Sequence, residues 1–285
     1  MKVISVVPNE FKDPGFAVTN QVIDRLTAGG TEIYIPDELR GSFGNKLGVK
    51  FVPQEQLFHT ELILTLGGDG TILKIASAAA EHEVPILGLN LGRVGFLAEI
   101  EWTQFELLPK ILSGNYEVAE RMMLELKVNG KTVGSALNDV CITADKPIKL
   151  IDFTVSADGR TVSHYRADGV ILSTPTGSTA YSLSAGGPVI DPRLDCICFT
   201  PICPLLPSKN RTIVFSDKTV LEFTGVNSRE SGTVATLDGS VTVKIDSADT
   251  VSVGRSPNPV RLVNMNNQKF YDILFTKNRE GKADI

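Results

Sequence analysis

The chain lacks the features that mark secreted, membrane-spanning and nucleic-acid-binding proteins. Its four cysteines form no Cys-x-x-Cys pair, so neither a disulfide framework nor a zinc site is predicted. No apolar run approaches the ~18 residues of a membrane span, and the N-terminal run from Val3 to Val7 is too short for a signal peptide. The 28 Lys and Arg residues are scattered and are outnumbered by 33 Asp and Glu, which argues against nucleic acid. We therefore expect a cytoplasmic protein with no membrane or nucleic-acid partner.

Apolar strands and helical segments alternate through residues 1–115. Short apolar runs typical of buried strands occur at Val3 to Val7, Glu32 to Ile35, Leu62 to Leu64 and Pro85 to Asn90. Residues 36–58 are polar and glycine-containing, and their pattern predicts no element. The alternation indicates a doubly wound, mainly parallel sheet, which places binding sites where strands end. With 285 residues the chain has room for a second domain.

A glycine-rich turn follows the third of these runs. The segment Gly67-Gly68-Asp69-Gly70-Thr71 lies between an apolar strand and a helix expected from about Thr71 to Glu81. Glycines allow close backbone approach and positive φ, and amides at a helix start favour anions. The turn therefore predicts a phosphate site formed by Gly67, Gly68, Gly70 and Thr71, with Asp69 binding a hydroxyl or a metal ion. The alternative is a tight turn without a ligand.

The hydrophobic period changes near residue 120. Leu124, Leu126 and Val128 alternate with polar residues into Asn129-Gly130, and Asp158-Gly159 repeats this hairpin signal. Strand-like segments continue at 195–200, 211–215, 219–224, 233–246 and 249–253. The pattern predicts an antiparallel β domain. We place the domains at 1–115 with 264–285, and at 116–263.

A second polar cluster lies within this β region. Residues 168–188 pack hydroxyls among glycines directly after an apolar strand, an arrangement suited to hydrogen bonding a ribose, phosphate or nucleobase. A Ser/Thr-rich surface loop is the alternative interpretation. Tyr181 within this stretch could stack on an adenine.

Five motifs in order resemble those of bacterial NAD kinases over nearly the whole chain. They are Gly67 to Thr71, Asn90 to Leu97 with Gly92 and Gly95, Asn138-Asp139, Arg166 to Gly169, and Thr174 to Ser182. Diacylglycerol, sphingosine and 6-phosphofructo-kinases also carry the Gly-Gly-Asp-Gly element in similar form. The resemblance implies a Rossmann-like N-terminal domain and a β-sandwich-like C-terminal domain. It also implies that the final segment, with Phe270 to Phe275, packs back on the first domain.

The resemblance implies ATP-dependent phosphorylation of the adenosine-ribose 2′-hydroxyl of NAD, with Asp69 as the catalytic proton acceptor. It assigns NAD binding to Asp69, Gly70, Asn138, Asp139, Lys149, Arg166, Asp168, Thr179, Ala180, Tyr181, Ser182, Leu183, Ser184 and Ser240. Three of these depart from the family: Asp139 stands for Glu, Lys149 for the His and Ser240 for the Gln of some relatives. Pro204-Leu205 also replaces the usual Pro-His.

The same resemblance implies a divalent metal ion, Mg or Mn, with ATP as phosphoryl donor, and a homodimer or homotetramer. Phosphoryl transfer depends on positioning and charge neutralisation, so Asp69 either binds Mg²⁺ through water or accepts the incoming hydroxyl proton. A lipid or sugar kinase of the Gly-Gly-Asp-Gly group would share Asp69 but not the segment from Thr179 to Ser184. A non-catalytic NADP-binding sensor would bind without turnover.

Overall fold

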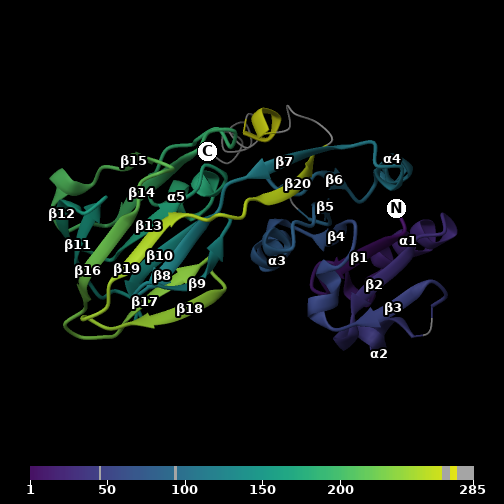
Figure 1. Cartoon of the computed structure of the whole chain (residues 1–285), viewed down its shortest axis with the longest axis horizontal. Coiled ribbons are helices and arrows are strands. Elements are labelled where there is room, and N and C mark those ends of the chain that lie inside the picture. The colour runs from purple at the N-terminus through teal and green to yellow at the C-terminus, as the bar shows by residue number, and fades with distance from the viewer. Residues whose placement is uncertain (45, 93–94, 265–269, 275–285) are drawn as a thin grey trace, which may run out of the picture. The chain divides into compact units, whose positions relative to one another are not determined.

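The chain folds into two compact units, which we describe separately. The computed structural model describes residues 1–44, 46–92, 95–264 and 270–274. Unit 1 comprises Met1–Glu120 with Val260–Ile285, and unit 2 comprises Arg121–Pro259 (Figure 1). The domain bounds expected from the sequence, 1–115 with 264–285 and 116–263, stay a prediction.

Unit 1 contains one eight-stranded sheet with helices. Its elements are β1 (Val3–Pro8), η1 (Pro14–Phe16), α1 (Ala17–Ala28), β2 (Glu32–Pro36), η2 (Asp37–Leu39), α2 (Arg40–Phe43), β3 (Val49–Val52), η3 (Gln54–Phe58), β4 (Ile63–Gly67), α3 (Asp69–Glu81), β5 (Ile86–Asn90), β6 (Ile100–Glu101), η4 (Phe105–Leu107), α4 (Leu108–Leu112), β7 (Glu117–Arg121) and β20 (Val260–Asn264). The strand order is β3-β2-β1-β4-β5-β20-β7, with β6 paired to β5. The pairs from β3 to β5 are parallel, which confirms the predicted doubly wound sheet.

The strand order places the switch point of the sheet between β1 and β4. Chain connections run from β1 outward to β3 and then return across β1 to β4, so the connecting segments leave the carboxyl ends of these two strands in opposite directions. In a Rossmann-like sheet, ligands bind outside the strand ends at this point. The glycine turn that follows β4 therefore lies where the fold favours a binding site.

The core of unit 1 explains why these segments form these elements. All residues of β4 and β5 are buried, as expected for parallel strands covered on both faces. Helix α1 buries Val22, Ile23 and Leu26 on one side. Near its start the carboxylate of Asp13 accepts hydrogen bonds from the Val18 and Thr19 amides at 3.1 and 2.7 Å, so it satisfies free N–H groups of the first turn.

After β20, the structure of unit 1 is described only for residues 270–274. Residues 270–274 are helical, and the ring of Phe270 lies 5.9 Å from that of Phe96 between centroids. The family resemblance implies that the segment 264–285 packs against the first domain. Residues 265–269 and 275–285 of that prediction, Phe275 included, lie outside the described residues.

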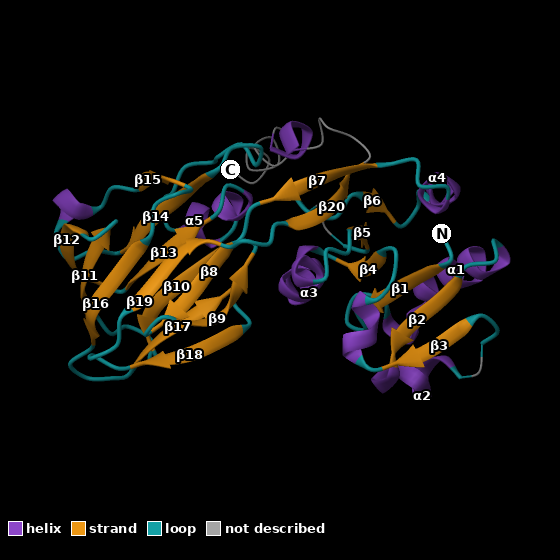
Figure 2. Cartoon of the chain, in the orientation of Figure 1, coloured by secondary structure: helices purple, strands orange, loops and turns teal. Residues whose placement is uncertain are grey.

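Unit 2 is a sandwich of two antiparallel sheets, each six-stranded. Its elements are β8 (Leu124–Val128), β9 (Lys131–Ala136), β10 (Asp139–Ala144), β11 (Ile151–Ala157), β12 (Arg160–Ala167), β13 (Gly169–Ser173), η5 (Thr176–Thr179), α5 (Tyr181–Ser184), β14 (Cys196–Ile202), η6 (Pro207–Lys209), β15 (Ile213–Ser216), β16 (Leu221–Asn227), β17 (Thr233–Leu237), β18 (Val241–Ile245) and β19 (Val251–Arg255). One sheet has the order β15-β14-β13-β10-β17-β18 and the other β12-β11-β16-β19-β8-β9. Figure 2 shows how strands dominate this unit.

Alternating side chains of the two sheets form the core of unit 2. Leu124 and Leu126 on β8 and Val140 and Ile142 on β10 belong to one buried cluster. Their polar neighbours point away, which is the period-2 pattern of a sandwich. This confirms the predicted β-sandwich-like domain. The residues between, including Asp139 and Cys141, lie on the outer face of their sheet.

The predicted hairpins form with the expected backbone. Asn129 and Gly130 have φ values of 51° and 77°, and Asp158 and Gly159 have 48° and 77°. Positive φ at both central residues is the geometry of type I′ turns, which asparagine, aspartate and glycine tolerate. A further turn with positive φ, Asp238-Gly239, joins β17 to β18.

The segment 36–58, which the sequence left unassigned, holds short elements. It contains η2, α2, β3 and η3, and β3 pairs with β2 at the sheet edge. None of the helices in the described part of the chain has the length and apolar character needed to cross a bilayer.

Candidate functional site

The residues singled out in the sequence form two clusters, one in each unit. The first surrounds the turn from β4 to α3. Helix α3 begins at Asp69, two residues earlier than expected, with Gly68 as its N-cap residue. Asp69 is therefore part of the first helical turn.

The three glycines of this turn differ in what the local packing requires of them. None of Gly67, Gly68 and Gly70 has a positive φ, so that expectation is wrong; Gly68 is extended, with φ −134° and ψ −168°. A Cβ on Gly67 would lie 2.1 Å from the Thr71 hydroxyl oxygen, whereas Cβ atoms on Gly68 and Gly70 would meet nothing within 4 Å. The turn thus needs Gly67 for packing and leaves open space beside the other two glycines.

Asp69 is held by the segment after the second glycine-rich loop. Its Oδ2 accepts a hydrogen bond from the Phe96 amide at 2.8 Å, and its Oδ1 accepts from the Leu97 and Ala98 amides at 3.1 and 3.2 Å. A carboxylate offers about four lone-pair positions, so three are occupied by backbone N–H groups. These bonds fix the orientation of the carboxylate. Residues 93–94 of the loop lie outside the described residues.

Asn9 and Lys12, in the segment that follows β1, also belong to the first cluster, although neither was predicted from the sequence. Asn9 Nδ2 donates to the Thr71 hydroxyl at 3.2 Å. Lys12 is exposed, and a Cβ built on Gly92 would lie 3.6 Å from its Nζ. Both residues follow β1, the strand on the other side of the switch point. Their position directly after the first apolar strand was the signal that could have identified them.

The second cluster surrounds Asn138 and Asp139 at the start of β10. The Thr174 amide donates to the Asn138 carbonyl at 2.9 Å, and the Thr174 hydroxyl donates to the Leu137 carbonyl at 2.6 Å. Gly177 packs so closely that a Cβ would lie 2.0 Å from the Asn138 carbonyl oxygen. The start of the hydroxyl-rich segment is therefore bound to the Asn138-Asp139 segment.

Many hydroxyls of that segment bond within the protein. Ser178 Oγ donates to the Pro175 carbonyl at 2.7 Å, and Ser182 Oγ lies 3.1 Å from the Thr200 hydroxyl. Both serines are fully buried. The Ser182 side chain thereby joins the segment to β14 of the sheet. The exposed residues Tyr181, Leu183 and Ser184 present the surface that a ligand can reach, and Thr179 and Ala180 are half-buried.

Asp139 is a buried carboxylate with an altered ionisation. Its side chain is 6% exposed. Burial, and next the charge of Asp238, raise its pKa from 3.8 to about 7. The pKa of the neighbouring Cys141 thiol rises to about 12, mainly because of burial and then because of Asp139. Asp139 therefore changes charge near neutral pH.

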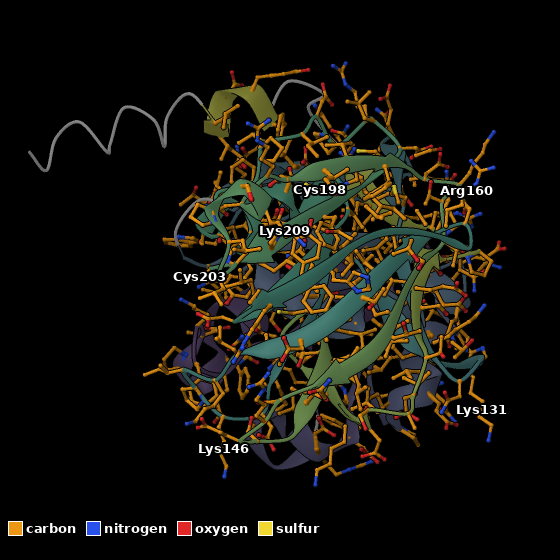
Figure 3. All side chains as sticks on the ribbon, turned by 90° about the vertical axis from the view of Figure 1, so that its left-hand side faces the viewer. Lys131, Lys146, Arg160, Cys198, Cys203 and Lys209 are labelled. Carbon is orange, nitrogen blue, oxygen red and sulfur yellow. The ribbon has the colours of Figure 1, made fainter. Side chains whose placement is uncertain are left out.

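Tyr181 brings several of the predicted residues together. Burial raises the pKa of its hydroxyl, followed by smaller effects of Cys141, Asp139, Cys203 and Asp168. The negative charges of Asp168 and Asp139 thus both raise the pKa of the Tyr181 hydroxyl. In the view of Figure 3, Cys198 lies among the strands, whereas the exposed Cys203 lies near the outline of the molecule.

Three further predicted residues make contacts of their own. Lys149 forms an ion pair with Glu230, and it lines a pocket of about 170 Å³ together with Arg166 and Asp152. Arg166 Nε is 3.9 Å from Asp152 Oδ1. Ser240 is exposed in the turn after β17, where its hydroxyl donates to the Leu237 carbonyl at 3.3 Å.

Two buried side-chain atoms within the described residues have no hydrogen-bond partner. They are Arg166 Nε and Ser173 Oγ. Ser173 is fully buried and pairs with Asp139 across strands β13 and β10. An unpaired buried polar atom is costly, and a bound ligand is one way to satisfy it. Ser173 lies within the hydroxyl-rich stretch 168–188 but is not among the residues assigned to NAD.

The described residues contain no group of three or more His, Cys, Asp and Glu side chains placed to hold a metal ion. Asp69 is the carboxylate at the glycine turn, and three of its lone-pair positions are already used. Magnesium in phosphoryl-transfer sites is commonly bound by one or two carboxylates together with substrate phosphates. The residues present fit such an arrangement, with the triphosphate as the main ligand.

A Rossmann-like unit with an acidic glycine turn, joined to a β-sandwich with a hydroxyl-rich segment, defines a two-domain nucleotide-binding protein of the kinase type. The family model of the ATP-NAD kinase N-terminal domain matches residues 6–116, and that of the ATP-NAD kinase C-terminal domain matches residues 137–265. The chain belongs to the ATP-NAD kinase family.

Curated relatives match over most of their length. The NAD kinase of Lachnoclostridium phytofermentans is 36% identical over 97% of this chain and 99% of its own. That of Geotalea daltonii is 40% identical over 79% of this chain and 80% of its own.

Solved structures share the fold. An NAD kinase from Archaeoglobus fulgidus in complex with ATP superposes with a TM-score of 0.76 at 28% identity, covering 97% of this chain and 98% of that chain. Yeast NADH kinase complexed with NADH gives a TM-score of 0.84 at 23% identity, covering 95% of this chain and 85% of that chain.

Proposed function

We propose that this chain transfers the γ-phosphoryl group of ATP to the 2′-hydroxyl of the adenosine ribose of NAD, giving NADP. The observation that carries the proposal is the position of Asp69. This carboxylate lies at the start of α3, is fixed by three backbone amides of residues 96–98, and is next to Gly68 and Gly70, beside which there is open space. A chain of this family with that arrangement has the parts needed to position a hydroxyl next to a phosphoryl group.

The triphosphate of ATP binds at the turn from Gly67 to Thr71. Gly68 and Gly70 leave room for it, and the amides at the start of α3 carry the positive end of the helix dipole. Lys12 supplies a positive charge at the neighbouring strand end. These groups stabilise the charge that moves between the phosphates during transfer.

Asp69 orients the acceptor hydroxyl and accepts its proton. Its bonds to the Phe96, Leu97 and Ala98 amides leave about one lone-pair position for this hydrogen bond. A general base must lie within hydrogen-bond reach of the proton it removes, and a fixed carboxylate keeps that distance short. Gly70 lies beside it.

NAD binds through residues of unit 2. Asn138 and Asp139 hydrogen-bond the acceptor ribose, while Asp168 and the segment from Thr179 to Ser184 line the dinucleotide pocket. Lys149, Arg166 and Ser240 contribute further contacts to the dinucleotide. The clustering of Asp139, Asp168 and Tyr181 supports this assignment.

A divalent cation, Mg²⁺ or Mn²⁺, accompanies ATP and would be held mainly by the triphosphate, because the remaining lone-pair position of Asp69 is taken by the acceptor hydroxyl. When bound, it neutralises phosphate charge. We assign the enzyme to the cytoplasm, and the family resemblance implies a homodimer or homotetramer.

One assay tests the function. Purified protein is incubated with NAD, ATP and Mg²⁺, and NADP is followed with an NADP-specific dehydrogenase. NADP formation that is lost without ATP supports the proposal. Binding of NADP without turnover, or phosphorylation of only a lipid or sugar, would overturn it.

A further inference from the structure

A second aspartate, outside the set predicted from the sequence, holds the Asn138-Asp139 segment. The carboxylate of Asp238, in the turn between β17 and β18, accepts hydrogen bonds from three successive amides. Its Oδ2 accepts from Leu137 at 2.8 Å, and its Oδ1 accepts from Asn138 at 2.8 Å and from Asp139 at 3.0 Å. The Asp238 amide in turn donates to the Asp139 carbonyl at 3.0 Å.

The carbonyl groups of the same segment are fixed from the other side. Thr174 donates from its hydroxyl to the Leu137 carbonyl and from its amide to the Asn138 carbonyl. Gly177 closes against Asn138, where a Cβ would clash. The backbone of residues 137–139 therefore has all three amides and all three carbonyls bonded.

The side chains of this segment are in contrast left without partners. No hydrogen bond joins the Asn138 amide group or the Asp139 carboxylate to another residue in the described part of the chain. Asn138 is half-buried and Asp139 is 6% exposed. A fixed backbone that presents unpaired polar side chains is the arrangement of a preorganised binding site.

We propose that Asp238 is a positioning residue for NAD: its carboxylate holds Asn138 and Asp139 in the orientation that binds the acceptor ribose. It does not touch the substrate. This inference rests on the proposed function, because it names how one part of that site is kept in place.

The negative charge of Asp238 gives the proposal a distinctive signature. It lies against Asp139 and is the second cause, after burial, of that residue's raised pKa. The other titratable groups that act with Asp139 are Cys141 on the same strand and Tyr181 on α5. Removing the Asp238 charge should therefore shift the ionisation of Asp139 to lower pH, whereas a simple loss of stability would not.

Two variants suit the backbone of the turn. Asp238 has φ 45°, which asparagine and glycine tolerate better than alanine. Asp238→Asn keeps one acceptor oxygen but removes the charge and sets an NH₂ group against one amide. Asp238→Gly removes all three bonds.

Asp246→Asn, at an exposed carboxylate after β18, removes one charge from the same unit and is the control.

Steady-state kinetics at saturating ATP provide the first measurement. We expect Asp238→Asn to raise KM for NAD about 10-fold and Asp238→Gly to raise it further, with kcat within about threefold of the parent. We expect the acid limb of kcat/KM for NAD to have its midpoint near the Asp139 pKa of about 7 in the parent, and to move to lower pH in both variants. Asp246→Asn should change neither value.

Unchanged KM for NAD and an unmoved pH midpoint in a folded Asp238→Asn protein would overturn the proposal. An equal fall of kcat for all substrates, with a lowered melting temperature, would also contradict it, because that result indicates a purely structural role.

Amide hydrogen exchange separates this inference from the proposed function. The Leu137, Asn138 and Asp139 amides should exchange slowly in the parent and at least about 10-fold faster in Asp238→Asn. Slow exchange in the variant contradicts the positioning role whether or not NADP is formed. A parent protein that makes no NADP, but shows this difference in exchange, contradicts the proposed function alone.

Discussion

Gly95 and Asp69 lie so close together that a Cβ built on Gly95 would stand 2.2 Å from Asp69 Oδ1. Atoms at that distance cannot coexist, so any side chain at position 95 must displace the carboxylate or the loop. The absence of a Cβ is what allows the following amides, from Phe96 to Ala98, to reach Asp69. The second glycine-rich loop thereby fixes the orientation of the Asp69 carboxylate in the first glycine-rich turn.

Gly95→Ala should therefore reduce NADP formation strongly. We expect kcat to fall about 100-fold, because a shift of about 1 Å at a reacting group has an effect of that size. The control is Gly41→Ala in α2, where a Cβ meets nothing within 4 Å and φ is not positive. Coupled NADP assays compare the two variants. Equal activity of Gly95→Ala and the parent would show that the position of Asp69 does not limit turnover.

Asp69→Asn should lose activity and also some stability. Loss of the base predicts a fall in kcat of about 10² to 10⁴. An amide NH₂ group cannot accept, so at least one of the three backbone N–H groups loses its partner, at about 1–3 kcal/mol. Thermal melts and assays at saturating NAD, ATP and Mg²⁺ measure the two effects. A variant that keeps more than about a tenth of parental kcat would remove Asp69 from the mechanism.

Lys12→Met should weaken ATP binding with little effect on NAD. The substitution keeps most of the side-chain length and removes the charge that we propose faces the triphosphate, so we expect KM for ATP to rise about 10-fold. Lys110→Met, at an exposed position on α4, removes one charge elsewhere in unit 1. Kinetics with each substrate varied in turn distinguish the outcomes. A rise in KM for NAD alone would assign Lys12 to the other ligand.

Local signals in the sequence predicted most of the fold. The apolar runs before Gly67 and after Pro85 became buried parallel strands because they are apolar on both faces. Asn129-Gly130 and Asp158-Gly159 formed hairpin turns because these residues tolerate positive φ. In each case the determining residues are neighbours along the chain.

The contacts that fix the candidate site could not be predicted in this way. The partners of Asp69 lie 27 to 29 residues away, and Asp238 reaches a segment about 100 residues before it. Only the folded backbone brings these groups together. The internal hydrogen bond of Ser182 was likewise not predictable: its hydroxyl bonds Thr200, a residue 18 positions away, whereas the composition of the segment 168–188 suggested contacts with a ligand. Local composition identifies a polar segment but not which of its groups remain accessible.

The ionisation of Asp139 makes a prediction about stability. Its folded-state pKa is raised from 3.8 to about 7, so folding favours the protonated form. The contribution of this group is therefore fully present below about pH 4 and is lost as pH rises to about 7. Between pH 5 and pH 8 the loss is about 3 kcal/mol, since one pKa unit corresponds to about 1.4 kcal/mol.

Asp139→Asn should remove this dependence, because an amide of nearly the same shape does not ionise. Urea unfolding of parent and variant at pH 5 and pH 8, followed by circular dichroism, measures the change. We expect the variant to gain about 3 kcal/mol relative to the parent between the two pH values. Asp246→Asn, whose carboxylate is exposed, should follow the parent at both. If the difference between parent and Asp139→Asn is the same at pH 5 and pH 8, Asp139 is already ionised at pH 5, and its proposed change of charge near neutral pH is wrong.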